Sequence, residues 1–581
     1  MNTIFSFIQE QESLYKQPIP LEEGWYWGMK DHIRRSFLYK HSQFEQNNED
    51  RETRPFKNIV RPILNVQYRT EGFDVKDIEI YVDNPDTYYK SFLIKKYHDK
   101  WALTNAIDTF IDELVESFVD YGGVLVKNVK GVRPEVVDLR TVSFCDQTDF
   151  LSGPFAIKHF YSPSQLKDME SVGWGKTGAT ITIDDLILKA ENSKNQNSDN
   201  GETKTPGKYL EIYEVHNVSE RDFDITSEDS DPQIIICGFY NDDNGNPHGV
   251  TLFKNKEPKL PFKFLKRDPI QGRALGWGGI EELFEPQMWT NFAEITIAGM
   301  LEHASKVYYV TTDPKFKGQI ITDRDNGSIL DLQPNGEFRQ VDNQPRNMTM
   351  FENYQVKMHE HAMEIGSASD LALSKEPASG TPFKSVELQV AESNSLHLWR
   401  QGRIATFLDE IYRDWIIPQL GKELTKGTKF LSELSSDEMI SVSEALMTSV
   451  ANDKMKKALI TGENISRQQY DEVRAVVGET FNKSGNKKFL ELLKDEMTGE
   501  KLSISTNIAG KQKDLAKMTD KLVNTIRQFI ASPEIRQDPD MRQMLNAVLE
   551  SSGLSPLKYN PVRQQPNMQD MAKQTQLAPQ M

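Results

Sequence analysis

The stretch Gly272-Arg-Ala-Leu-Gly-Trp-Gly-Gly-Ile-Glu-Glu-Leu283 separates a strand-rich part of the chain from a helical part. The glycines at positions 276, 278 and 279 favour a tight turn where strands end. Pro286 follows at a place where the first turn of a helix tolerates a residue without an N–H. The stretch therefore predicts a helix that begins near residue 280 and reaches about His303. One side of this helix would carry Phe284, Met288, Phe292, Ile295 and Gly299.

The chain before this turn shows both helical and strand patterns. Apolar residues at helical spacing predict one helix over residues 100–120, which the glycines at 122 and 123 would end. Strands are expected over residues 124–264, where β-favouring residues dominate. Earlier still, the proline inside residues 59–65 predicts a short irregular segment that leads to a hairpin near Glu71-Gly72.

The chain after residue 303 is expected to be mainly helical, with one β-like insert. The insert covers residues 307–341 and contains the dipeptides Asn326-Gly327 and Asn335-Gly336, which are strong signals for tight turns. Helices are expected over residues 350–367 and 384–417.

Pro418 and Gly421 would end the long helix. Residues 434–558 are expected to be helical apart from a strand near 501–507. The fold class expected is therefore α+β.

Composition limits the function classes. The chain has 581 residues, a net charge of −17 and a hydrophobic content of 38%, so it can bury a sizeable core of three or four domains. An acidic balance argues against strong general binding to nucleic acid. The only cysteines, Cys145 and Cys237, are expected as reduced, buried thiols rather than a disulfide framework. No uncharged apolar run reaches the length of a membrane span, so none is expected.

Motifs that resemble catalytic or metal sites fail on spacing. Gly175-Lys176-Thr177 lacks the upstream glycine of a phosphate-binding loop, since position 170 is Glu170. His359-Glu360-His361 places its histidines two positions apart, whereas a helical zinc site needs four. We therefore expect no cofactor, no metal, no catalytic residues and no enzymatic activity.

The order of elements resembles the portal proteins of tailed bacteriophages over roughly residues 50–510. Phe118-Val-Asp-Tyr-Gly-Gly-Val-Leu-Val126 is similar to the helix-to-strand passage of the portal wing. Asp138–Asp146, followed by Phe155–Tyr161, is similar to the wing sheet. Gly272–Leu283, followed by a helix that contains Asn291, is similar to the entry into the portal stem.

The resemblance implies a portal-like protomer with a mixed α/β wing, a two-helix stem, a small α/β clip, a long wing helix and a helical crown. The implied boundaries are 1–50 for an N-terminal helical extension, 51–279 for the wing, 280–303 and 348–370 for the stem helices, 304–347 for the clip, 371–383 for a tunnel loop, 384–420 for the long wing helix, 421–560 for the crown and 561–581 for a disordered tail.

The same resemblance implies a structural protein that forms a homododecameric ring at a capsid vertex, through which double-stranded DNA is packaged and ejected. Its partners would be the terminase large subunit, head-completion adaptor and tail proteins, and the major capsid and scaffold proteins. Its location would be the virion, after assembly in the host cytoplasm and without a membrane. Contact with DNA would be transient and non-specific. The implied tunnel-loop residues are Ser374, Lys375, Ser379, Gly380 and Lys384, and the implied docking turns of the clip are Asn326, Gly327, Asn335 and Gly336.

Two other classes of protein compete with this hypothesis. One is a non-portal minor head, tail or scaffold-type virion protein, which would have no central channel. The other is an ATP- or metal-dependent enzyme acting on DNA, which would need a phosphate or metal site that the sequence does not show. Gene neighbourhood separates these classes, because a portal gene normally lies next to the terminase and capsid genes.

Overall fold

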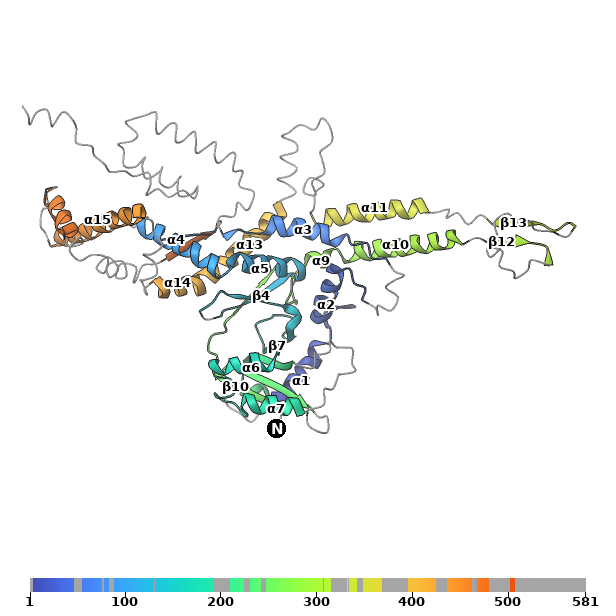
Figure 1. Ribbon diagram of the computed structural model, residues 1–581, viewed down its shortest axis with the longest axis horizontal. Coiled ribbons are helices and arrows are strands. Elements are labelled where there is room, and N and C mark those ends of the chain that lie inside the picture. Colours follow the sequence, from blue (N-terminus) through green and yellow to red (C-terminus); the bar gives the residue numbers. More distant parts are fainter. Residues whose placement is uncertain are drawn as a thin grey trace, which may run out of the picture. The chain divides into compact units, whose positions relative to one another are not determined.

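Helices and small antiparallel sheets make up the protein, which is an α+β protein as the sequence predicts (Figure 1). Figure 1 shows the computed structural model. It describes residues 4–45, 55–75, 78–82, 88–129, 131–192, 209–223, 230–241, 247–306, 308–314, 332, 334–341, 348–367, 395–424, 436–461, 466, 468–479 and 502–506. The chain divides into two units, each described below by itself. The first covers residues 1–72, 110–130 and 134–404, and the second covers residues 73–109, 131–133 and 405–581.

Two antiparallel sheets form the centre of the first unit. The five-stranded sheet has the order β10-β9-β8-β7-β6 and comprises β6 (Val142–Phe144), β7 (Phe155–Tyr161), β8 (Leu210–Val218), β9 (Gln233–Asn241) and β10 (Pro247–Lys256). The three-stranded sheet has the order β11-β4-β5 and comprises β4 (Gly123–Lys127), β5 (Glu135–Val137) and β11 (Phe262–Lys266). The strand-rich region expected over residues 124–264 is thus confirmed.

Both faces of the five-stranded sheet are buried, because alternate residues of its central strands point to opposite sides. Ile212 and Ile236 pack with α6 (Pro163–Asp168) and α7 (Ile183–Asn192) in one hydrophobic core. Tyr213 and Ile235, on the other face of the sheet, belong to a second hydrophobic core. Figure 1 shows α6 and α7 next to β10. The second core also contains Phe262 of the three-stranded sheet and the buried thiol of Cys145. Cys237 is buried too, so both cysteines are core thiols as predicted.

The N-terminal segment belongs to this core. Helix α1 (Ile4–Tyr15) buries Phe7 and Ile8 in the second core, and α2 (Met29–Lys40) follows. Between these helices a hairpin pairs β1 (Ile19–Glu22) with β2 (Trp25–Trp27), which a purely helical segment would not contain.

Two glycine motifs that the sequence singles out meet in space. Helix α5 (Ile107–Tyr121) ends at Gly122, which has φ +77°. The carbonyl oxygen of Gly122 accepts hydrogen bonds from Arg267 N at 2.9 Å and from Gly276 N at 3.0 Å. A Cβ at Gly122 would lie 2.4 Å from the carbonyl oxygen of Gly276. Only glycine permits this close passage of two main chains.

The helical part of the first unit follows the glycine turn. It contains α9 (Gly279–Glu282), α10 (Phe284–Ser305), α11 (Met348–Ile365) and the start of α13 (Ser395–Ile411). The expected helices near 280–303 and 350–367 are confirmed. α10 and α11 lie side by side (Figure 1). The β-like insert is confirmed as the antiparallel pair β12 (Tyr308–Thr311) and β13 (Phe338–Val341). The remaining short helices are η4 (Leu139–Thr141), η5 (Met169–Val172) and α8 (Glu220–Phe223).

One expectation at the start of the first unit is wrong. Residues 60–71 form helix α3 (Val60–Glu71) instead of an irregular segment and a hairpin. Pro62 is the third residue of this helix, and the N–H groups of the first turn have no partner inside a helix. Proline therefore costs little there.

The second unit contains β3 (Ile78–Val82), α4 (Tyr88–Thr104), the start of α5, the end of α13, η8 (Tyr412–Ile416), α14 (Ile417–Leu424), α15 (Ser436–Ile460), a helix over 468–479 and β14 (Leu502–Thr506). The strand expected near 501–507 is confirmed as β14, which pairs antiparallel with β3. A single helix over 100–120 is wrong. α4 ends at Thr104 and α5 begins at Ile107, because Ala106 has φ +50° and breaks the helical backbone.

The two sheets of the first unit are joined by a buried group of charges, here called the Glu214 group. Lys127 of β4 holds both carboxylate oxygens of Glu214 of β8 at 2.6 and 2.7 Å. His216 lies between Glu214, at 3.1 Å, and Glu257, at 2.9 Å. Burial opposes charge on Glu214, but hydrogen bonds from His159 and His216 and the charge of Lys127 hold its pKa well below 4.5. Burial also opposes charge on His216, but its two carboxylate neighbours raise its pKa above 6.5.

The Gly122 contact predicts that alanine destabilises the protein more at position 122 than at another glycine with positive φ. Gly122→Ala should be destabilised by the left-handed backbone, roughly 1–2 kcal/mol, and further by the clash with Gly276. Gly24→Ala is the matched control, because Gly24 has φ +79° with nothing within 4 Å of its Cβ position. Urea unfolding of both variants measures the difference. Equal losses would show that the close passage does not matter.

The Glu214 group predicts a pH window of stability. The contribution of Glu214 is present above about pH 4.5 and is lost as the pH falls through its lowered pKa. The contribution of His216 is present below about pH 6.5 and is lost as the pH rises through its raised pKa. Thermal unfolding between pH 4 and 9, followed for wild type and His216→Gln, should show a shallower alkaline decline in the variant. The exposed His303→Gln serves as control, and an unchanged decline in His216→Gln would contradict the assignment.

Candidate functional site

The tunnel-loop and docking-turn residues expected from the sequence lie only partly within the residues that the structure describes. Ser374, Lys375, Ser379, Gly380, Lys384, Asn326 and Gly327 lie outside the described residues. Asn335 and Gly336 lie in a turn just before β13, and Asn335 has φ +70°, which the Asn-Gly signal predicts. Thr312 N donates to Glu337 O at 3.1 Å and closes this end of the ribbon. The turn is therefore confirmed, and its docking role stays a prediction.

The most charged interior site is a set of ionised side chains in the first unit, here called the Glu71 cluster. Its members come from four separate segments, α3, the end of β11, α9 and α13, and are Glu71, Arg267, Asp268, Glu282, His397 and Arg400. Arg267 Nη2 lies 2.8 Å from Glu71 Oε1, and both side chains are completely buried. Arg400 Nη2 contacts Asp268 at 2.5 Å and Glu282 at 3.1 Å.

Electrostatics in the Glu71 cluster favour the charged form of its central carboxylate. Burial by itself would raise the pKa of Glu71, but the charge of Arg267 and hydrogen bonds from His397 and Arg267 lower it to about 2. The pKa of Glu282, by contrast, is raised by burial. The ion pairs of the cluster thus join α3, α9 and α13.

The Glu71 cluster also fixes the end of α11 to the start of α13. His397 Nδ1 lies 3.0 Å from Glu71 Oε1, and His397 Nε2 lies 3.2 Å from the carbonyl oxygen of Ser367. Gln67 Nε2 donates to the carbonyl oxygen of Gly366 at 3.1 Å. Residues 367 and 397, which flank the undescribed stretch 368–394, are therefore held together by buried polar contacts.

The first half of helix α10 buries polar side chains and exposes apolar ones. Gln287, Thr290 and Asn291 are buried, and Gln287 Nε2 donates to Lys57 O at 2.7 Å and to Asn291 Oδ1 at 2.9 Å. Met288 and Phe292, on the side predicted to be apolar, are 50% and 56% exposed. In this half the polarity is the reverse of that of a surface helix in a monomeric protein, whereas further along the helix Ala293 and Ile297 are buried.

The start of α13 shows the same pattern, whereas α11 exposes charged and apolar residues together, with Glu352 and Lys357 exposed as well as Val356. α11 buries Gln355, whose Nε2 donates to Glu294 at 2.6 Å, while Val356 beside it is 57% exposed. At the start of α13, His397, Arg400 and Gln401 are buried and Trp399 is 52% exposed. The apolar outer faces of these three helices comprise Met288, Trp289, Phe292, Leu301, Met350, Tyr354, Val356, Leu396, Leu398 and Trp399.

The β12–β13 ribbon also lacks a core. Every residue of β12 and β13 is exposed or half-buried, including Tyr308, Tyr309 and Val310. Among the described residues no third strand pairs with the ribbon. An isolated two-stranded ribbon is marginally stable in water, and its open edges can pair with another chain.

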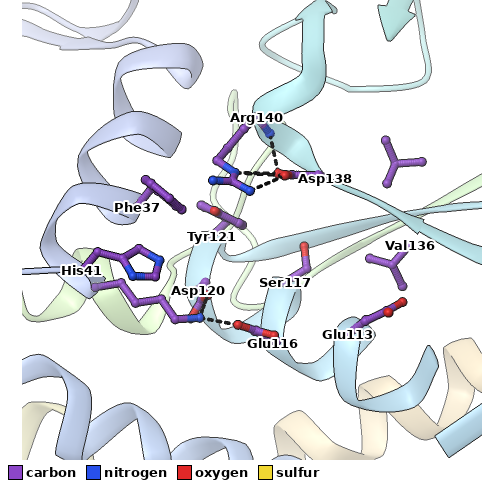
Figure 2. Close-up of a pocket in the computed structure, with 12 residues that line it drawn as sticks. Phe37, His41, Glu113, Glu116, Ser117, Asp120, Tyr121, Val136, Asp138 and Arg140 are labelled. Atoms are coloured by element: carbon purple, nitrogen blue, oxygen red, sulfur yellow. Dashed lines mark hydrogen bonds and ion pairs between the residues drawn. The ribbon is translucent and has the colours of Figure 1, made fainter. Parts of the chain in front are cut away.

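A surface pocket of about 300 Å³ lies between α2, α5 and β5–η4. Figure 2 shows Arg140 and Asp138 near one end, Asp120 and Glu116 near the other, and Tyr121 between them. Arg140 Nη2 contacts Asp138 at 2.6 Å, and Lys40 Nζ contacts Asp120 at 2.6 Å and also Glu116. The cations of the pocket are therefore already paired with its carboxylates, which is typical of a structural pocket.

The two sequence motifs that lack the spacing of a phosphate or metal site lie in a turn and on a helix. Lys176 lies in a turn with its Nζ 3.9 Å from Glu170. His359 and His361 lie on α11. Within the described part of the chain, no group of three or more His, Cys, Asp or Glu side chains could hold a metal ion. Every helix in that part is too short or too polar to cross a membrane.

The sequence analysis missed the Glu71 cluster. Glu71 and Arg267 are 196 positions apart, so no local spacing marks them as partners. The reversed polarity of the first half of α10 has a clearer signal, since Gln287, Thr290 and Asn291 follow helical spacing on the side away from Met288 and Phe292.

No protein-family profile and no curated protein matches the chain. Among solved structures, the chain is similar to one from the virion of a native gene transfer agent (GTA) particle, with 9% identity, 81% of this chain and 98% of that chain covered, and a TM-score of 0.30. It is also similar to a chain from the neck of an empty GTA particle, with 7% identity, 74% and 97% covered, and a TM-score of 0.33. TM-scores this low do not establish a shared fold.

The Glu71 cluster predicts a large loss of stability when one partner is removed. Glu71→Gln should leave the fully buried Arg267 with only the more distant carboxylate of Glu282, at 3.7 Å, and loss of one partner of a buried pair costs roughly 3–5 kcal/mol. Glu302→Gln removes a fully exposed partner of Lys306 and should leave stability unchanged. Urea unfolding followed by circular dichroism measures both variants. A Glu71→Gln variant as stable as wild type would show that the cluster does not join the helices.

Proposed function

We propose that this chain is the structural subunit of a ring that serves as a portal at a capsid vertex. The observation that carries the proposal is the set of large apolar side chains exposed on α10, α11 and the start of α13, beside buried polar ones. Helices that bury Gln287, Gln355 and Arg400 while exposing Phe292, Val356 and Trp399 gain stability only when a further surface covers their apolar side.

The arrangement of these outer faces favours copies of the same chain as the covering surface. The exposed residues lie on different helices, so one copy can present α10 while its neighbour presents α11 or α13. Contacts between two different faces of identical subunits repeat by rotation, and they form a ring where that rotation closes. The open β12–β13 ribbon offers a further surface for strand pairing between subunits or with a docking protein.

The charge of the chain supports the same function. A net charge of −17 suits a passage that DNA crosses without being held, since each phosphate contact strengthens binding. In this proposal, residues 371–383 are the tunnel loop, with Ser374, Lys375, Ser379, Gly380 and Lys384 facing DNA. Asn326, Gly327, Asn335 and Gly336 are the docking turns for the packaging motor and the adaptor proteins.

Substitution of the outer faces should weaken assembly without unfolding the subunit. Phe292→Glu and Val356→Glu place a charge where a neighbouring copy would cover an apolar side chain, and burial of an unpaired charge is costly. Leu188→Glu is the matched control, because Leu188 on α7 is 57% exposed but lies outside α10, α11 and α13. Mass photometry of the purified variants should show smaller species for the first two and wild-type assemblies for the control.

Electron microscopy of the same samples separates the portal from its alternative. Rings with a central hole, in the wild type and in Leu188→Glu, would agree with the portal. Assembly without a channel, even with scaffold protein added, would overturn it in favour of a non-portal minor head, tail or scaffold-type protein. Wild-type rings in Phe292→Glu and Val356→Glu would show that the exposed apolar side chains of α10 and α11 are not the assembly surface.

A further inference from the structure

The long helix expected to end at Pro418 continues past it, and the expectation is wrong. In the second unit, α13 passes through η8 and into α14, which runs to Leu424. η8 is a single π turn, in which Ile417 N–H donates to the carbonyl oxygen of Tyr412, five positions earlier. Such turns hold one residue more than an α-helical turn and occur often at functional positions.

The π turn matches a four-residue repeat of buried side chains. Leu408, Tyr412, Ile416 and Leu420 are each no more than 1% exposed. Four residues of a regular α-helix rotate by about 400°, so these three steps would drift about 120° around the axis. All four side chains are nevertheless buried. The wide turn therefore absorbs the additional residue of the repeat.

The additional residue can be removed without disturbing the buried face. Without Arg413, whose side chain is 67% exposed, the buried side chains would be spaced by four, three and four positions. Those 11 positions rotate by about 1,100°, within about 20° of three full turns. The hydrogen bond from Ile417 N–H to Tyr412 O would then join residues four positions apart, as in a regular α-helix. The sequence thus encodes a straight helix with one residue added.

Pro418 weakens the same turn a second time. Proline has no N–H, so one carbonyl oxygen of the preceding turn lacks its main-chain donor. Sharp bends in helices occur at prolines and at π turns, and here the two are one residue apart. By contrast, the turns from Ala405 to Ile411 are regular α-helix.

The side before the π turn is fixed by a buried contact. The hydroxyl of Tyr412 lies 3.1 Å from Nε2 of His98 on α4, and the two rings are 5.5 Å apart. His98 is 1% exposed and Tyr412 is completely buried. This contact ties the start of the π turn to α4 within the second unit.

We propose that Tyr412–Pro418 is a built-in hinge, at which α14 changes direction relative to the anchored end of α13. The π turn and Pro418 lower the number of main-chain bonds that resist bending, while the buried repeat keeps the helix continuous. The hinge is a property of the second unit and does not depend on the function proposed above.

Hydrogen exchange of the purified full-length chain, read by mass spectrometry, tests the hinge. In wild type, amides 413–417 should exchange at least about tenfold faster than amides 407–411. Deletion of Arg413 restores a regular helix, and Pro418→Ala restores the missing donor. Each variant should slow exchange of amides 414–417, which both variants retain, about tenfold. Arg413→Ala, which removes the side chain without changing the register, should exchange like wild type.

Each outcome decides the proposal. Wild-type amides 413–417 as protected as amides 407–411 would overturn it, as would unchanged exchange in a folded deletion variant. If the deletion variant loses its helical circular dichroism, Pro418→Ala decides alone, and unchanged exchange there overturns the hinge. Since the measurement follows local opening and not ring formation, a failed hinge leaves the assembly proposal standing.

Discussion

The first unit depends on the contact between the main chains at Gly122 and Gly276. Because neither residue has a side chain, the carbonyl oxygen of Gly122 accepts from both Arg267 N and Gly276 N. The same contact sets the position of Arg267 as it leaves β11, so that its guanidinium reaches Glu71 on α3. The position of Arg267 in the buried ionic cluster therefore depends on a main-chain approach that only glycine allows.

A polar interior has a consequence for the exterior of the same helices. The Glu71 cluster and the Gln287–Asn291 pair occupy part of the inner sides of α13 and α10, and several large apolar residues of these helices lie on their outer sides. In a monomer this arrangement exposes apolar surface to water, which is unfavourable. In an assembly it supplies the contact surface, while the buried charges keep the helices from sliding against one another. In the proposed assembly, the buried polar groups thus hold the helices together and the exposed apolar side chains form the contact with a neighbouring subunit.

Local signals in the sequence predicted much of the fold, and long-range pairing explains the rest. The start of α9 and α10 followed from the glycines near 276 and Pro286, because turn chemistry acts on neighbouring residues. The same local rules misjudged Pro62, whose position within a helix depends on where that helix begins. Pro418 was misjudged because the four-residue repeat that includes Tyr412 requires a π turn, which a search for regular helical spacing does not detect. The candidate loop residues lie outside the described part, and the Glu71 cluster joins distant segments that no spacing rule connects.

The placement of the arginines gives the acidic composition a structural meaning. Arginine is the side chain best suited to hold phosphate, because its planar guanidinium binds two oxygens at once. Arg267, Arg273 and Arg400 are each no more than 2% exposed, and each is paired with a carboxylate inside the first unit. These three guanidiniums therefore form internal ion pairs and are not accessible to nucleic acid at the surface. With these three guanidiniums used as internal joints, fewer phosphate-binding groups remain at the surface, which agrees with the proposed passage of DNA without retention.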